Sequence, residues 1–227
     1  MSTQSLAKII SVFNEKGGSG KTTTACQLAG TLGHRGFDVL VADLDPQQTS
    51  ASWLSRQGGK NFPASIWPGF RYGKEIATEL GKLAQKYDVI VIDCAPSVEQ
   101  AGTWAALLIS DLALIPSKLG PSDTDALPAA KALTKNAWRT LGRNYPVYVV
   151  PVAYRKNRQD ERMAIELLAE DQDFPLTPCA LGDRVTYTRS MIYGATAHSL
   201  PNTKEAVQEI DELADFIQQQ LQLNVKA

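Results

Sequence analysis

The sequence has little cysteine and no long apolar run, and its charges nearly cancel. Its three cysteines lie far apart, which matches neither a disulfide framework nor a zinc-binding pattern. No apolar stretch approaches the ~20 residues that cross a bilayer, and the first residues lack the charged-then-apolar pattern of a secretion signal. The 23 basic and 24 acidic residues give a net charge of −1, so overall charge indicates no nucleic-acid partner. These absences exclude secreted and membrane-spanning proteins and predict a reduced, cytoplasmic setting.

What is present is an ordinary globular composition, with 44% hydrophobic residues. Short, nearly continuous apolar runs predict strands buried on both faces at residues 9–13, 39–42, 89–92, 112–115 and 147–150. Helical patterns alternate with them, which predicts an α/β fold, a mostly parallel twisted sheet flanked by helices on both faces. We expect residues 1–227 to form a single domain without an N-terminal helix-turn-helix domain. Residues 57–73 are expected to form a surface excursion with one short edge strand.

A glycine-rich loop is the strongest motif. It lies between the first predicted strand and the first helix, and consists of Lys16, Gly17, Gly18, Ser19, Gly20, Lys21, Thr22 and Thr23. Glycines let successive backbone N–H groups converge on phosphate oxygens, and the following helix adds the positive end of its dipole. Lys21 is placed to reach the β- and γ-phosphates, and Thr22 to bind Mg²⁺. Glu15 stands where the general pattern has glycine, so the loop is a variant of that pattern.

Two predicted strands end in carboxylates that suit the same chemistry. Asp43 and Asp45 close the strand at 39–42, and Asp93 closes the strand at 89–92. Because ligands bind at the carboxyl edge of parallel sheets, these acids are expected beside the phosphate loop. Asp93 suits the water shell of Mg²⁺, and Asp45 suits the metal site and the attacking water of hydrolysis.

These motifs together resemble the ParA/MinD group of ATPases, which are SIMIBI-type P-loop NTPases with a deviant Walker A loop. Lys16 matches the second lysine that is the signature of that loop, and residues 43–47 resemble the group's second motif. Residues 110–116, 121–123, 184–187 and 193–194 are similar to the small plasmid-partition ParA proteins, the ParF-like ones.

The resemblance implies a homodimer with ATP held between the subunits. Lys16 would reach the partner's phosphates, as an arginine finger does in other NTPases, and Asp45 would orient the attacking water beside Lys21. The enzyme would be a slow ATPase that uses ATP and Mg²⁺ and is stimulated by DNA and a partner protein. The segment expected to approach the adenine is Tyr154, Arg155 and Lys156.

A basic stripe predicts where DNA binds. Residues 118–158 hold eight basic and two acidic residues, a local charge of +6. Four of the basic residues recur at every fourth position, so a helix would align them on one side. With no acid among them, their repulsion costs stability unless they meet an anion. The candidate DNA contacts are Lys131, Lys135, Arg139 and Arg143, together with Arg184 and Arg189 nearer the C-terminus.

The sequence therefore predicts a partition ATPase that binds DNA non-specifically in the ATP state. It would segregate a plasmid or another large cargo on the bacterial nucleoid, with a centromere-binding or cargo adaptor protein encoded elsewhere. One alternative is a ParA-like protein that assists conjugative DNA transfer, which residues 119–125 also resemble. Another is a MinD-type membrane-surface ATPase, which the glutamine-rich tail at 216–227 disfavours because it lacks a basic amphipathic face. An electron carrier like the nitrogenase iron protein is disfavoured by the absence of paired cysteines.

Overall fold

The computed structural model describes residues 6–56, 62–96 and 101–225. Within them, a seven-stranded parallel sheet has the order β3-β2-β4-β1-β5-β6-β7. Its strands are β1 (Lys8–Val12), β2 (Val39–Asp43), β3 (Ser65–Pro68), β4 (Val89–Asp93), β5 (Leu112–Ser117), β6 (Val147–Tyr154) and β7 (Leu181–Gly182).

The predicted strands are confirmed, and β3 is the short edge strand expected within residues 57–73. Residues 57–61 of that stretch lie outside the described residues. Two features were not predicted. Strand β6 continues to Tyr154, and β7 is a two-residue strand that adds an edge beyond it.

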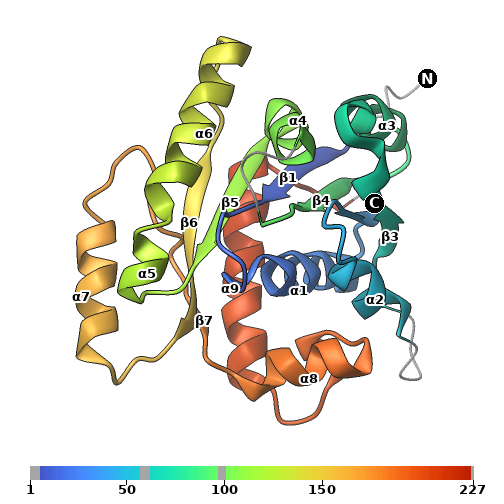
Figure 1. The fold of residues 1–227 in the computed structure, drawn as a ribbon. Coiled ribbons are helices and arrows are strands. Elements are labelled where there is room, and N and C mark those ends of the chain that lie inside the picture. The colour runs from blue at the N-terminus through green and yellow to red at the C-terminus, as the bar shows by residue number, and fades with distance from the viewer. Residues whose placement is uncertain (1–5, 57–61, 97–100, 226–227) are drawn as a thin grey trace.

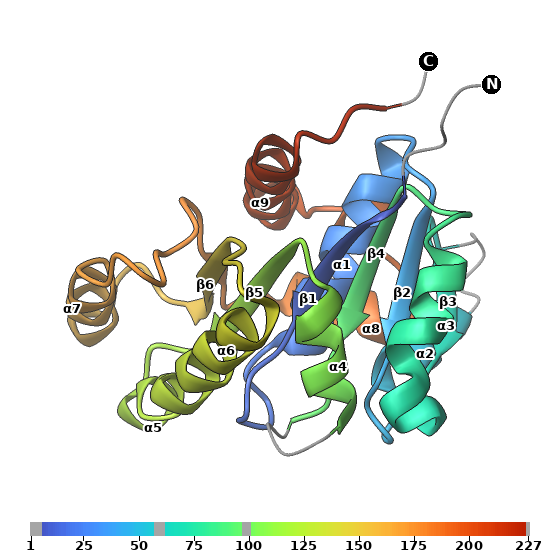
Figure 2. The same ribbon diagram turned by 90° about the horizontal axis from the view of Figure 1, so that it is seen from above.

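Helices cover both faces of the sheet, as predicted, with α1, α8 and α9 on one side and α3, α4 and α6 on the other (Figures 1 and 2). None of the described helices is long and apolar enough to cross a membrane. The α-helices are α1 (Lys21–His34), α2 (Thr49–Ser55), α3 (Ile76–Leu83), α4 (Ala101–Ile109), α5 (Pro121–Thr124), α6 (Leu127–Leu141), α7 (Gln159–Leu168), α8 (Val185–Tyr193) and α9 (Lys204–Leu221). The 3₁₀ helices are η1 (Phe70–Glu75) and η2 (Ala197–Ser199).

Alternate side chains of the central strands pack into two separate hydrophobic cores, one on each face of the sheet. In β4, Val89 and Val91 pack on the side of α1 and α9, whereas Ile90 and Ile92 pack on the side of α3, α4 and α6. Successive side chains of a strand point to opposite faces, so a strand covered on both sides must be apolar throughout. This explains why the runs found in the sequence are continuous rather than alternating.

The order of the strands reverses beside β1. From β1 the chain moves to one edge of the sheet with β2 and β3, and later to the other edge with β5, β6 and β7. In open α/β sheets, ligands bind outside the carboxyl ends of the strands at the point where the order reverses. The loop from β1 to α1 lies at this point.

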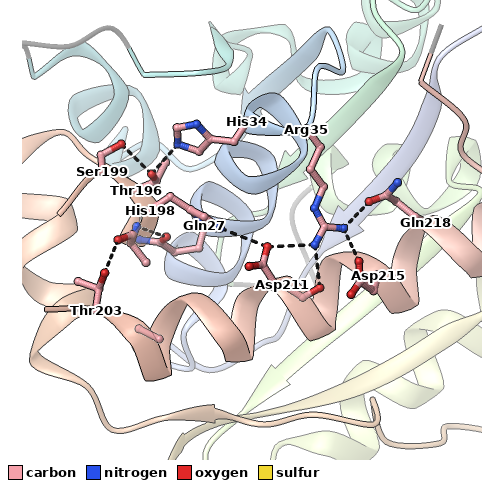
Figure 3. Close-up of polar contacts among 12 residues, drawn as sticks. Gln27, His34, Arg35, Thr196, His198, Ser199, Thr203, Asp211, Asp215 and Gln218 are labelled. Atoms are coloured by element: carbon pink, nitrogen blue, oxygen red, sulfur yellow. Dashed lines mark hydrogen bonds and ion pairs between the residues drawn. The ribbon is translucent and has the colours of Figure 1, made fainter. Parts of the chain in front are cut away.

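The C-terminal end of α1 is tied to α9 and to the segment before it (Figure 3). Arg35 forms ion pairs with Asp211 (3.0 Å) and Asp215 (2.6 Å), and its guanidinium points between them. Gln27 accepts a hydrogen bond from the backbone N–H of Ala197 (2.9 Å). These contacts hold α1 against α9 and the segment before it. They therefore fix the position of the helix whose N-terminal end follows the glycine-rich loop.

The turn after α8 depends on glycine. Gly194 has a left-handed conformation (φ 62°), and a Cβ there would overlap the carbonyl oxygen of Arg56. Gly142, which ends α6 at φ 64°, has open space at the same place. Gly194→Ala is therefore expected to lower the free energy of unfolding by about 3 kcal/mol, and Gly142→Ala by about 1 kcal/mol. Denaturant unfolding of both variants measures the difference, and equal losses would contradict the close approach to Arg56.

Candidate nucleotide-binding site

The loop between β1 and α1 opens the site. Gly18 and Gly20 have left-handed backbones (φ 71° and 93°), and Gly20 precedes the first turn of α1. A Cβ on Gly17 or Gly18 would meet no described atom within 4 Å, so the loop faces open space. The first N–H groups of a helix have no partner within the helix, which makes this opening suitable for a phosphate chain.

Lys21 lies over this loop and is 6% exposed. Its Nζ donates a hydrogen bond to the carbonyl oxygen of Lys16 (2.9 Å). Burial lowers the pKa of the Lys21 ammonium, and the charge of Asp93 is the largest of those that offset this effect. The predicted phosphate-binding lysine therefore lies close to a predicted carboxylate.

Lys16 takes a different direction from Lys21. Its Nζ donates a hydrogen bond to Ser122 Oγ (2.8 Å) and pairs with Asp123 Oδ1 (2.9 Å), both on α5. The two lysines of the motif thus have separate surroundings, one beside the carboxylates at the sheet edge and one on α5.

Asp43 and Asp93 form a buried carboxylate pair at the ends of β2 and β4. They are paired in register, and they are 0% and 1% exposed. Burial raises the pKa of Asp93 to about 7, with a further contribution from the charge of Asp43, while the hydroxyls of Thr22 and Ser50 act in the opposite direction. Burial also raises the pKa of Asp43. A cation bound nearby would stabilise the ionised form of these two buried, neighbouring carboxylates.

Asp43 has a positioning role that the sequence analysis missed. One carboxylate oxygen accepts the backbone N–H of Asp45 (3.0 Å), and the other accepts the N–H of Ala51 in the first turn of α2 (2.9 Å). Asp43 thereby holds the loop that carries Asp45. The available signal was an acid inside a strand whose other residues are apolar, a position that requires hydrogen-bond partners when buried.

The residues around Asp93 fit a hydrated magnesium ion. Neither oxygen of Asp93 accepts a well-formed hydrogen bond among the described residues, and Ser19 Oγ is also buried without a partner. No group of three or more histidine, cysteine or acidic side chains in the described part of the chain makes a complete metal site. Mg²⁺ commonly takes one or two protein oxygens together with substrate phosphates and water, which is the arrangement that these groups can provide.

The three predicted adenine residues line a cavity of about 710 Å³ between the end of β6 and the start of α9. Strand β6 itself approaches the glycine-rich loop, because a Cβ on Gly20 would lie 3.0 Å from Val152. Glu161 holds Arg155 in place, since it accepts the backbone N–H of Arg155 (2.6 Å) and pairs with its guanidinium. The cavity is lined by Tyr154, Arg155 and Lys156 and, opposite them, by residues that include Asp183, Arg184 and Glu209.

The predicted basic stripe lies on α6 and just beyond it, but half of its charge is neutralised. Lys131 pairs with Asp171 (2.6 Å), and Lys135 pairs with Asp173 (2.7 Å). The argument that the stripe must meet an external anion was therefore wrong for these two lysines. The anions come from the segment after α7, about forty residues along the chain.

The other predicted DNA contacts also differ from one another. Arg184 is bound by Glu205 and Glu209, whereas Arg189 has no ion pair among the described residues. Arg139 donates a hydrogen bond to the neutral Asn136, and the guanidinium of Arg143 lies over the ring of Tyr145. In the described part of the chain, the predicted contacts without an acidic partner are Arg139, Arg143 and Arg189.

A family model described as an AAA domain matches residues 7–63, which include the whole glycine-rich loop. Over 210 residues the chain is 27% identical to the maintenance of carboxysome distribution protein A of Halothiobacillus neapolitanus, covering 92% of this chain and 95% of that protein. It is 31% identical over 149 residues to the chromosome partitioning protein ParA of Myxococcus xanthus, covering 49% and 52%. The chain is thus similar in sequence to carboxysome-distribution and chromosome-partitioning proteins of the ParA type.

The fold is also similar to that of solved structures. A plasmid partition protein from Borrelia burgdorferi, solved with bound AMPPNP, superposes with a TM-score of 0.74 at 22% identity, covering 94% of this chain and 99% of that one. The α/β sheet with helices on both faces is thus the P-loop NTPase fold that the sequence predicted. The match of the family model falls on β1, the glycine-rich loop, α1, β2 and α2.

Proposed function

We propose that this chain is an ATP-dependent partition or positioning ATPase that dimerises around ATP and binds DNA without sequence preference in that state. The observation that carries the proposal is the arrangement at one sheet edge of a glycine-rich loop, a buried lysine and a pair of buried carboxylates. The named relatives support the same conclusion, because they distribute carboxysomes or partition chromosomes and plasmids.

In this proposal, each side chain of the site has a defined task. Lys21 and the loop N–H groups bind the β- and γ-phosphates, and Thr22 and Asp93 hold the metal and its water shell. When bound, Mg²⁺ neutralises phosphate charge that develops as the bond to the γ-phosphate breaks. Asp45, held by Asp43, orients the attacking water.

Lys16 completes the site of a second copy. Its ammonium contacts Ser122 and Asp123 on α5 rather than the buried carboxylates at the sheet edge, so it is available to a neighbouring subunit once it leaves α5. A cation supplied from the partner makes hydrolysis depend on dimerisation. The adenine would lie in the cavity lined by Tyr154, Arg155 and Lys156.

Analytical ultracentrifugation with ATP, ADP or no nucleotide tests this function. The Asp45→Ala variant, which should bind but not hydrolyse ATP, is expected to form a stable dimer with ATP and Mg²⁺ and to stay monomeric with ADP. A chain that remains monomeric with saturating ATP, or that dimerises equally well without nucleotide, would contradict the proposal.

DNA contact is expected from the arginines without acidic partners. Three per chain (Arg139, Arg143 and Arg189) give about six phosphate contacts in a dimer, so the log–log dependence of affinity on salt should have a slope near −5. Freeing Lys131 and Lys135 should add contacts. The variant Asp171→Asn/Asp173→Asn is therefore expected to strengthen ATP-dependent DNA binding and to steepen the slope by roughly 3 to 4.

Fluorescence anisotropy of a labelled duplex at several salt concentrations measures both quantities. The matched control is Asp38→Asn/Glu75→Gln, which removes the same charge from two exposed acids near β2 and β3, at the opposite edge of the sheet. An equal gain in the control would mean that net charge, rather than the surface of α6, sets the affinity.

Segregation of cargo further requires an adaptor protein, and we place the protein on the bacterial nucleoid with it. A role in conjugative DNA transfer would use the same ATP cycle. The membrane-surface alternative is disfavoured by α9, whose apolar residues Ile210, Leu213 and Ile217 are fully buried against the sheet and so unavailable to lipid. Sedimentation with anionic liposomes checks this point, and the chain is expected to stay in the supernatant with ATP.

A further inference from the structure

Lys16 is held by its own chain. Its Nζ lies 2.8 Å from Ser122 Oγ and 2.9 Å from Asp123 Oδ1, so two of its three N–H groups have partners on α5. The Lys16 side chain is 32% exposed and the Asp123 side chain 14% exposed. The ion pair is thus partly buried, and the exposed part of the Lys16 side chain leaves the ammonium accessible to another anion.

Hydrogen bonds hold the two backbone segments that carry Lys16 and Asp123. Asn14 links them, because its side chain donates to the carbonyl of Pro116 at the end of β5 (2.8 Å) and accepts from the N–H of Lys16 (3.2 Å). The single turn of α5 begins at Pro121, and the N–H of Asp123 donates to the carbonyl of Gly120 (2.9 Å). The lysine and the acid therefore meet although they are 107 residues apart in the sequence.

We propose that Ser122 and Asp123 are positioning residues that hold Lys16 on its own chain until the phosphates of a second copy displace them. This inference rests on the proposed function, in which Lys16 acts on the partner's nucleotide. To do so, the ammonium must exchange a carboxylate for phosphate oxygens. Asp123 would then stand, unpaired, beside an incoming polyphosphate, and the repulsion between them opposes dimerisation. The contact thus raises the nucleotide concentration at which two chains join.

The test compares two substitutions that remove the same charge. Asp123→Asn releases Lys16, whereas Asp125→Asn removes an exposed acid two residues later that has no ion pair in the described part of the chain. Dimerisation is followed by ultracentrifugation against the concentration of AMPPNP with Mg²⁺, so that hydrolysis plays no part. We expect Asp123→Asn to lower the midpoint about fivefold, the effect of losing one partly exposed ion pair, and Asp125→Asn to leave it unchanged.

We call the contact of Lys16 with Ser122 and Asp123 the latch. Three further measurements distinguish the release of this latch from a general effect of the substitutions on charge or folding. Asp123→Glu, which keeps the carboxylate, should restore the wild-type midpoint more closely than Asp123→Asn. In the Lys16→Ala background, Asp123→Asn should bring no gain, because there is no ammonium to release. The affinity of the monomer for ADP should be the same in wild type, Asp123→Asn, Asp123→Glu and Asp125→Asn.

The possible results are distinct. A wild-type chain that dimerises while Asp123→Asn matches Asp125→Asn would overturn the latch and leave the proposed function standing. A higher midpoint for Asp123→Asn would also overturn it, since Asp123 would then orient Lys16 within the dimer. A wild-type chain that never dimerises with AMPPNP would overturn both proposals.

Discussion

Replacing Lys16 with alanine is expected to slow ATP hydrolysis by about a thousandfold, the scale of an arginine finger supplied by a partner. The same change should leave binding of one nucleotide to the free chain nearly unaltered. The reason is geometric, because the Lys16 side chain contacts Ser122 and Asp123 on α5, whereas Lys21 lies beside the buried carboxylates. Single-turnover hydrolysis and titration with a fluorescent nucleotide give the two quantities separately.

Two comparisons sharpen this prediction. Lys21→Ala should lose nucleotide binding itself, since its ammonium belongs to the phosphate loop of the same chain. Lys118→Ala removes an exposed lysine close to α5 and should change neither quantity. If Lys16→Ala weakened nucleotide binding to the monomer as much as Lys21→Ala does, Lys16 would act on its own nucleotide, and the role assigned to it across the dimer would be wrong.

Asp93→Asn is expected to stabilise the nucleotide-free protein while it abolishes magnesium-dependent hydrolysis. Burial raises the pKa of Asp93 from 3.8 to about 7, so at pH 8 the folded chain carries an unfavourable buried charge that asparagine removes. The gain in the free energy of unfolding at pH 8 should be about 4 kcal/mol, the equivalent of this rise in pKa from 3.8 to about 7.

The stability difference between Asp93→Asn and wild type should depend on pH. The folded chain binds more protons at Asp93 than the unfolded chain does, so wild-type stability contributed by this group falls as pH rises from about 4 to about 7. The advantage of Asp93→Asn should therefore vanish near pH 4 and be complete at pH 8. Denaturant unfolding in the absence of Mg²⁺ measures it, with Asp45→Asn as the half-buried control. A variant that is less stable than wild type at pH 8 would show that the Asp93 carboxylate is paired in the free chain.

Local patterns were sufficient to predict the framework of the site. Five apolar runs, the loop before the first helix and the acids at two strand ends are each encoded by residues close in the chain. The strand β7 was missed because two residues, Leu181 and Gly182, carry no periodic signal. The role of Asp43 was missed because a strand end with two acids does not reveal which of them turns inward.

Long-range ion pairs could not be predicted in the same way. The charge of Lys131 and Lys135 was counted within a window that ended before Asp171 and Asp173, the acids that neutralise them. The contact between Lys16 and Asp123 likewise depends on β1 and β5 being neighbours in the sheet. Charge patterns in the sequence therefore identified basic residues correctly but not the partners that decide whether they are available to DNA or to a second copy.

Retention on non-specific duplex DNA tests the central claim most directly. Wild type, Lys16→Ala and Asp45→Ala would each be measured with ATP, ADP and no nucleotide, all with Mg²⁺. The account predicts retention with ATP alone, its loss in Lys16→Ala, and its persistence in Asp45→Ala, which should bind ATP and dimerise without hydrolysing it. Retention that is independent of nucleotide, or unaffected by Lys16→Ala, would contradict the claim that an ATP-bound dimer is the form that binds DNA.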